Sequence, residues 1–344
     1  MRTRLTEALG IAEPIVQGPF GGGLSSVALA AAVSDAGGLG SFGVHHLEPE
    51  AIAGVAAELR AATRAPFALN LWVSDHDLPE SEMTEERFAA AVERLRGVYG
   101  DVGVAPPPYP DRFFPGFEVQ AEAVLEAAPA AFSFVFGIPD RGLLDAFHER
   151  GTVTIGTAIT LEEAVALDEA GVDLIVASGM EAGGHRGAFL AKAEDSLVGT
   201  LPLVRSVVEH VRAPVIAAGG IADAHGVAAA LALGAEAVQV GTAFLATEES
   251  GTTAEHRARL FAGETTRLTR SYTGRLARGI PNRLMDELAD TAEPYPYQGY
   301  LLRPVLEAAR RDGRTDVVSL WAGQATPLLR HHTARAVFDS LLPS

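Results

Sequence analysis

A histidine inside a glycine-rich segment is the first feature of this sequence that points to chemistry. Residues 178–187 read SGMEAGGHRG and follow the apolar run 173–177, DLIVA, which is typical of a buried parallel strand. Gly183 and Gly184 allow close backbone approach or a positive φ angle. His185 adds a side chain that titrates near neutral pH. The segment predicts a ligand site, with a flexible surface loop as the alternative.

Two later segments place glycines directly after short apolar runs. The first is 213–223, APVIAAGGIAD, and the second is 235–243, AEAVQVGTA. In a (β/α)8 barrel, the loops after strands seven and eight commonly form a phosphate site, with backbone N–H groups and a helix N-terminus facing the anion. Neither segment has the lysine of a nucleoside-triphosphate loop, which favours a phosphate monoester. The expected donors are the backbone N–H groups of Gly219, Gly220, Gly241 and Thr242.

The elements that must position these residues alternate regularly along the chain. Eight strands are expected, at 14–17, 38–42, 66–71, 131–136, 152–155, 173–177, 214–218 and 237–240. Helix signals lie between them: Ser25 or Ser26 can cap a helix over 27–36, and Thr160 with Glu163 forms a capping box. The alternation and the number of strands predict an α/β fold of the (β/α)8 TIM barrel type.

Two segments exceed a minimal barrel, which needs about 250 residues. Residues 72–130, after the third strand, are expected to form a lid-like insertion with a helix over 84–99. The barrel itself is assigned to residues 1–250. Residues 251–344 are expected to form a helical C-terminal extension packed on the barrel.

Composition narrows the classes of function. The chain has 344 residues, no cysteine and a formal net charge of −17. This charge disfavours nucleic acid and anionic membranes as partners, and the lack of cysteine excludes disulfides, thiolate metal sites and a cysteine nucleophile. No metal site is predicted. No apolar run is long enough to span a bilayer and no signal-peptide pattern opens the chain, so we expect a cytoplasmic protein without a membrane partner.

One stretch departs from the overall negative charge. Residues 267–283 carry five arginines and no acid. Three interpretations of these arginines stay open. They are a solvated basic face, ion pairs with acids of another subunit, or a cover over an anionic ligand.

Taken together, these segments resemble the nitronate monooxygenase family, formerly called 2-nitropropane dioxygenases, over nearly the whole chain. The resemblance rests on residues 17–23 (QGPFGGG), 33–40 (VSDAGGLG), 181–187 (EAGGHRG), 217–221 (AAGGI), 239–242 (QVGT), 273–279 (TGRLARG) and 320–324 (LWAGQ). The chain departs from the family where Ser178-Gly179 replaces a Gln-Gly pair and where Phe20 replaces a common methionine.

The resemblance implies an FMN-dependent (β/α)8 enzyme that converts an alkyl nitronate, or also a nitroalkane, and O2 into a carbonyl compound and nitrite. His185 would be the catalytic residue, taking the Cα proton of a nitroalkane or holding the oxygens of a nitronate. The residues expected to bind FMN are Gly21, Asn70, Ser178, Gly183, Gly184, Gly219, Gly220, Gln239, Val240, Gly241 and Thr242. Structural roles remain the alternative for Asn70, Gln239 and His185.

Several further residues are candidates near this site. Tyr109, Tyr272 and Gln324 are candidates for the substrate pocket. Glu181 is expected to orient a neighbouring site residue or to anchor its loop and not to act as a base. Arg186 either attracts an anionic substrate or is an exposed loop residue.

Two other functions stay open. An NAD(P)H-dependent FMN enoyl reductase of the same flavin-barrel superfamily would share the EAGGH and AAGGI segments. A phosphate-binding barrel without redox chemistry rests on fold alone. The expected partners are a small-molecule nitronate or nitroalkane and O2, with a homodimer as the candidate assembly.

Overall fold

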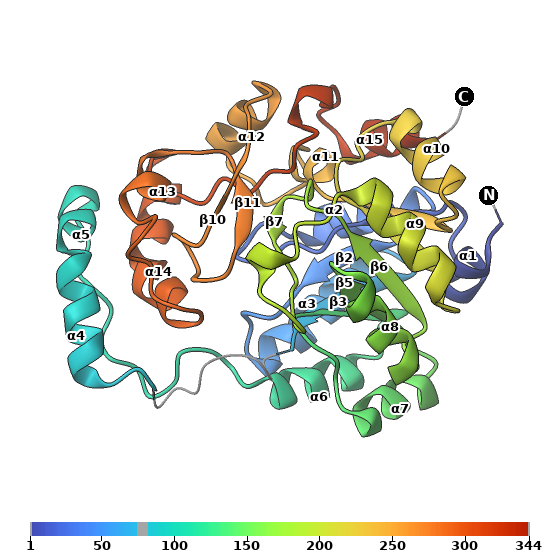
Figure 1. Cartoon of the computed structure of the whole chain (residues 1–344), viewed down its shortest axis with the longest axis horizontal. Coiled ribbons are helices and arrows are strands. Elements are labelled where there is room, and N and C mark those ends of the chain that lie inside the picture. Colours follow the sequence, from blue (N-terminus) through green and yellow to red (C-terminus); the bar gives the residue numbers. More distant parts are fainter. Residues whose placement is uncertain (1, 74–81, 343–344) are drawn as a thin grey trace.

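The computed structural model describes residues 2–73 and 82–342 and is built around a parallel sheet (Figure 1). Residues 74–81 of the predicted insertion, and the chain ends 1 and 343–344, lie outside the described residues. The parallel strands are β1 (Ile15–Gln17), β2 (Gly40–Gly43), β3 (Phe67–Trp72), β4 (Ala131–Val135), β5 (Val153–Ala158), β6 (Leu174–Ser178), β8 (Val215–Ala218) and β9 (Ala237–Val240).

The sheet closes into a barrel. Its strands follow the order β1-β9-β8-β6-β5-β4-β3-β2, and a parallel bridge between Val16 and Leu39 links β1 to the residue just before β2. Each predicted strand overlaps one of these eight. The prediction of a (β/α)8 barrel is therefore confirmed.

Helices surround the barrel. They are α1 (Arg4–Leu9), α2 (Val27–Asp35), α3 (Pro49–Ala62), α6 (Phe117–Ala127), α7 (Arg141–Glu149), α8 (Leu161–Ala170), α9 (Thr200–His210), α10 (Ala224–Ala232) and α15 (Ala334–Leu341). Ser26, rather than Ser25, caps α2 by accepting the Leu29 N–H at 3.0 Å. Helix α15 comes from the end of the chain and packs against α2 and α10.

The lower part of the barrel is filled with apolar side chains. Small and branched residues from the strands, among them Ala131, Leu174 and Ile216, cluster with Leu5 and Leu9 of α1. Since these side chains occupy the interior on one side, the space for a ligand lies at the other, carboxyl ends of the strands.

The additions to the barrel lie side by side in Figure 1. After β3 come α4 (Glu85–Arg94) and α5 (Arg96–Val102), so the helix predicted over 84–99 is divided at Leu95. Helix α5 packs on α14 (Tyr297–Arg311), and the extension also contains α12 (Ala254–Phe261) and α13 (Arg283–Glu287). The domain boundary at residue 250 and the lid role of 72–130 stay predictions.

The extension also contributes two strands that the sequence analysis did not predict. β10 (Arg267–Thr269) and β11 (Ala277–Gly279) pair antiparallel, and β11 pairs in turn with β7 (Gly184–His185). Strands of two or three residues are too short to show a periodic pattern. This small sheet contains His185, the predicted catalytic residue.

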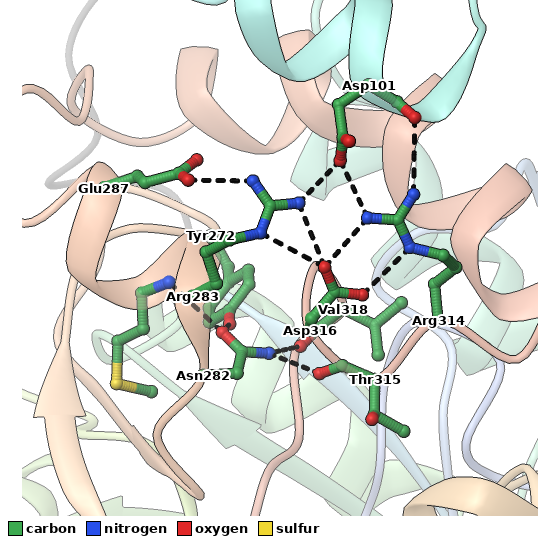
Figure 2. Close-up of polar contacts among 10 residues, drawn as sticks. Asp101, Tyr272, Asn282, Arg283, Glu287, Arg314, Thr315, Asp316 and Val318 are labelled. Atoms are coloured by element: carbon green, nitrogen blue, oxygen red, sulfur yellow. Dashed lines mark hydrogen bonds and ion pairs between the residues drawn. The ribbon is translucent and has the colours of Figure 1, made fainter.

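A charged cluster joins α5 to the extension (Figure 2). The Asp101 carboxylate accepts from Arg283 at 2.6 Å and from Arg314 at 2.7 Å. Asp316 accepts from the same two arginines, at 3.0 and 2.8 Å. Asn282, beside Arg283, accepts a hydrogen bond from the Tyr272 hydroxyl. The cluster therefore connects the insertion to a tyrosine of the site described below.

Replacing Asp101 with asparagine is expected to loosen α5 from the extension, because the neutral amide cannot serve two guanidinium groups in the same way. Hydrogen exchange should quicken across 96–102 and stay unchanged in the barrel strands. Asp290→Asn, at an exposed position of the extension, is the matched control. Unchanged exchange across 96–102 in D101N would show that apolar packing alone holds this helix.

Candidate active site

The carboxyl ends of the strands open into a cavity of about 860 Å³. Its walls come from the loops after the strands and from the C-terminal extension. The predicted site residues that line it are Gly21, Asn70, Ser178, Gly183, Gly184, His185, Gly219, Gly220, Gln239, Gly241 and Thr242. Val240 is not among the lining residues: its side chain is buried in β9, and its carbonyl accepts the Gly18 N–H at 2.9 Å.

His185 is held by residues that are far away in the sequence. Its backbone pairs with Ala277 of β11, and its Nε2 lies 2.9 Å from the Thr273 hydroxyl. The imidazole centroid lies 4.7 Å from the ring of Trp72, edge to face, and 5.2 Å from that of Trp321. The histidine is thus fixed between the barrel and the extension.

Burial lowers the pKa of His185 to about 4. Since the charged imidazolium is poorly solvated there, the ring is neutral at pH 7. A neutral imidazole has one nitrogen that donates and one that accepts. Because the Thr273 hydroxyl can take either role toward Nε2, His185 can offer a donor or an acceptor to a ligand.

Glycines let the backbone form one side of the cavity. Gly184, Gly219 and Gly220 have φ angles of +74°, +110° and +73°, a region that favours glycine. A Cβ atom on Gly183 would lie 2.5 Å from backbone atoms of Ala322 and Gly323. The Gly323 N–H in turn donates to the Thr242 hydroxyl at 2.8 Å. The two glycine segments and the 320–324 block therefore meet at one place.

The loop before His185 is anchored to α9. The Glu181 carboxylate accepts the Thr200 N–H at 2.9 Å and the Thr200 hydroxyl at 2.8 Å. The expected role of Glu181 as a loop anchor is confirmed.

Arg186 corrects the sequence interpretation. Its side chain is only 1% exposed, and its Nη1 donates to the Gly179 carbonyl at 2.6 Å. It is neither an exposed loop residue nor part of the main cavity wall. The β7–β11 pairing turns successive residues to opposite faces, so His185 faces the cavity and Arg186 faces away.

Two amide side chains line the cavity. Asn70 in β3 is 4% exposed and donates from Nδ2 to the Ser133 hydroxyl at 2.9 Å. Gln239 of β9 is half-buried. Both a ligand role and a structural role fit Asn70, since one of its polar atoms already has a protein partner.

Several aromatic residues of the cavity wall were not predicted from the sequence. The His45 ring stacks on Trp72, with centroids 3.9 Å apart and an interplanar angle of 8°. A Cβ atom on Gly21 would lie 2.1 Å from the His45 ring, so packing as well as ligand approach requires glycine there. Both aromatic residues follow or end a barrel strand at its carboxyl end, which is the signal that could have identified them.

The remaining residues that the sequence suggested for the site differ in whether they line the cavity. Tyr272 lines the cavity, whereas Tyr109 and Gln324 do not. The five arginines of 267–283 do not line it either. Instead Arg267, Arg270 and Arg283 form ion pairs with acids of the same chain. Arg275 packs between the rings of Phe136 and Tyr295, at 3.7 and 3.9 Å.

His256 supports the cavity from behind and makes stability depend on pH. Its ring lies 3.2 Å from the carbonyl oxygen of Trp321, and burial lowers its pKa from 6.5 to about 4. Between these values the unfolded chain binds more protons, so the free energy of unfolding falls as the pH drops from 6.5 to 4. The loss reaches roughly 3 kcal/mol.

His256→Gln should make this acid dependence shallower but not abolish it, because glutamine does not titrate whereas buried His185, whose pKa is also lowered to about 4, still does. Urea unfolding at a series of pH values measures the slope for both proteins. An equally steep slope in the variant would show that His256 is not the group responsible. His210→Gln, at an exposed position near the end of α9, is the control.

The nitronate monooxygenase family model matches residues 2–343. The chain belongs to the nitronate monooxygenase family. Nitronate monooxygenase from Pseudomonas aeruginosa is 38% identical over 351 residues, covering 99% of each chain. A probable nitronate monooxygenase from Staphylococcus saprophyticus is 35% identical, covering 99% of this chain and 97% of the relative. The resemblance seen in the sequence is confirmed, and the protein is an oxidoreductase.

Two solved structures are similar over nearly the whole chain. Nitroalkane oxidase from Streptomyces ansochromogenes has a TM-score of 0.90 and 36% identity, covering 98% of this chain and 96% of that one. FabK from Thermotoga maritima has a TM-score of 0.77 and 29% identity, covering 99% and 95%. Within the described residues, no helix is both long and apolar enough to cross a membrane.

Proposed function

We propose that this protein is an FMN-dependent nitronate monooxygenase that converts an alkyl nitronate and O2 into a carbonyl compound and nitrite. The observation that carries the proposal is the neutral His185 facing a glycine-lined cavity of about 860 Å³. Family membership and the similarity to nitroalkane oxidase support it. A cytoplasmic location and a homodimer stay predictions.

The residues present fit FMN. The cavity volume lies within the range of about 300–1,000 Å³ that is usual for cofactor sites. Gly219, Gly220, Gly241 and Thr242 offer a backbone cradle for a phosphate. Asn70 and Gln239 offer donors and acceptors for the polar edge of the flavin ring. When bound, FMN supplies the electron transfer between nitronate and oxygen.

His185 can act on the nitro group in two ways. Its ring N–H can donate to an oxygen of an anionic nitronate, and its unprotonated nitrogen can accept the Cα proton of a neutral nitroalkane. A pKa of about 4 makes it a weak base. The site therefore favours substrates that arrive already deprotonated, so nitronates should react faster than neutral nitroalkanes.

The cavity wall assists this chemistry. The rings of Trp72 and Trp321 beside His185 exclude water, which strengthens a hydrogen bond to an anion. Arg310 lines the cavity and donates to the Gly22 carbonyl at 3.0 Å. Its positive charge favours an anionic substrate over a neutral one.

The test is oxygen consumption together with nitrite release. The FMN-loaded protein is mixed in air with propyl-1-nitronate and, separately, with 1-nitropropane. We expect oxygen uptake and nitrite with the nitronate and a slower reaction with the neutral compound. Absence of both signals with the nitronate would refute the proposal.

The likeness to FabK keeps one alternative, an NAD(P)H-dependent FMN enoyl reductase. To test this alternative, NADH and a short enoyl thioester are added to the FMN-loaded protein under nitrogen. Rapid NADH oxidation that depends on the thioester, without any response to nitronate, would establish the reductase instead.

A further inference from the structure

Gly299 is a helical glycine that neither the backbone nor the packing requires. It lies in the first turn of α14 and lines the cavity. Its φ angle is outside the left-handed region that favours glycine. Beyond its chain neighbours and the backbone of its own helix, an added Cβ atom would meet only the Thr273 Cα among the described residues, at 3.9 Å. Since glycine is a poor helix former, folding does not explain its presence here.

The space beside Gly299 lies next to the proposed catalytic residue. Thr273, which faces this space at 3.9 Å, also places its hydroxyl 2.9 Å from Nε2 of His185. None of the residues that we assign to FMN comes from α14. A substrate held by His185 can therefore extend toward Gly299 without displacing a residue of the proposed cofactor site.

The glycine leaves a gap in one face of α14. Gly299, Arg303, Leu306 and Arg310 line the cavity. Their spacing of four, three and four residues places them on the same face of the helix. Gly299 is the first residue of this row and the one without a side chain. The cavity is therefore wider here than it would be with any other residue at this position.

An aromatic wall runs from the histidine past this gap. The Trp72 ring lies 4.7 Å from the ring of His185 and 5.6 Å from that of Tyr295. The Tyr295 ring in turn lies 5.6 Å from that of Phe114. All four rings line the cavity. Aromatic rings attract one another edge to face or offset-stacked, at centroid distances of about 4.5–7 Å. A flat aromatic group therefore fits this wall better than a short alkyl chain does.

We propose that Gly299 determines specificity by admitting nitronates whose reacting carbon carries an aryl group, such as the nitronate of phenylnitromethane. The aryl ring occupies the space beside Gly299 and contacts the rings of Tyr295 and Trp72, while the nitronate oxygens stay at His185. This inference rests on the proposed function, and it names the substrate class of the same site.

Binding of unreactive analogues is the first test. Phenylacetate has the heavy-atom skeleton of the phenyl nitronate, with carbon in place of the nitro nitrogen, and propionate corresponds in the same way to ethane nitronate. Trp72 and Trp321 are the two tryptophans of the sequence and both line the cavity, so tryptophan fluorescence of the FMN-loaded full-length protein reports binding there. We expect phenylacetate to bind at least about tenfold more tightly than propionate.

A third carboxylate distinguishes an aromatic wall from a merely apolar one. Cyclohexylacetate carries a ring that is more hydrophobic but not flat, so it should bind more weakly than phenylacetate. Equal affinities for phenylacetate and propionate would overturn the proposal. Cyclohexylacetate binding as tightly as phenylacetate would overturn the assignment of an aryl group.

Two substitutions at Gly299 separate a need for space from a need for glycine. Gly299→Ala adds only a Cβ atom without a close contact, so both affinities should stay near those of the parent protein. Gly299→Leu fills the gap and should weaken phenylacetate binding at least about tenfold, with propionate nearly unchanged. Gly54→Leu, at an exposed position of α3 outside the cavity lining, is the matched control. An unchanged phenylacetate affinity in Gly299→Leu, or an equal loss of both ligands, would overturn the proposal.

Turnover separates this inference from the proposed function. In Gly299→Leu, kcat/KM for the phenylnitromethane nitronate should fall at least about tenfold, with ethane nitronate nearly unchanged. Turnover of both nitronates without a difference between parent and variant would refute the role of Gly299 and leave the proposed function standing. Selective loss of phenylacetate binding without turnover of either nitronate would refute the proposed function and support the role of Gly299. If Gly299→Leu does not fold, the three carboxylates still decide the matter in the parent protein.

Discussion

Replacing His185 with asparagine is expected to reduce turnover of neutral nitroalkanes by roughly 10²- to 10⁴-fold, the usual contribution of a general base. Asparagine retains an amide donor, so turnover of a preformed nitronate should fall less, by about ten- to a hundredfold. Flavin content should stay near that of the parent protein, because the proposed phosphate cradle is formed by the backbone of residues 219–220 and 241–242 and not by His185. Steady-state kinetics with both substrate forms measure the difference.

The comparison of the two substrate forms separates a base from a hydrogen-bond donor. Equal losses with nitronate and nitroalkane would assign His185 a donor role only. Undiminished activity with both would remove it from the mechanism. His148→Asn is a matched control, since this histidine lies on α7 and contacts Asp173 at 3.0 Å, away from the cavity lining.

Replacing Gly220 with valine is expected to yield protein with little flavin. Gly220 has a φ of +73°, and a β-branched residue in that region costs about 1–3 kcal/mol. A Cβ atom there would lie 3.4 Å from the Glu181 side chain, which is an ordinary contact, so the expected strain comes from the backbone angle. If the neighbouring N–H groups hold the phosphate, FMN binding should weaken by roughly ten- to a hundredfold.

Fluorescence titration of the apoprotein with FMN gives the dissociation constant. Gly54→Val is the matched control, because a Cβ atom at this exposed position of α3 meets nothing within 4 Å. An unchanged affinity in Gly220→Val would place the phosphate elsewhere in the cavity. Riboflavin, which lacks the phosphate, should be affected less than FMN by the substitution.

The position of Arg186 could not be predicted from the sequence. His185 and Arg186 are adjacent, yet His185 lines the cavity whereas Arg186 is buried outside its lining. In the sequence both are consecutive residues of one predicted loop. Only the pairing of β7 with β11, nearly a hundred positions later in the chain, turns them to opposite faces.

The sequence by itself determined the barrel and most of its glycine-lined cavity. Each barrel strand is a short apolar run bounded by glycine, proline or a capping residue, and such local signals depend only on nearby residues. Gly219, Gly220 and Gly241 were predictable in the same way, because they directly follow β8 and β9 in the sequence. These predictions succeeded because backbone geometry and strand burial leave their pattern in consecutive residues.

Only the tertiary structure decided the chemical environment of the site. Thr273 and Trp321 meet His185 through the extension, and burial by these remote segments lowers the pKa of the imidazole. The folded structure also buries Arg186, and it pairs three arginines of 267–283 with acids of the same chain. A pKa and an ion pair depend on the sum of contacts from distant segments, and that sum exists only once the chain has folded.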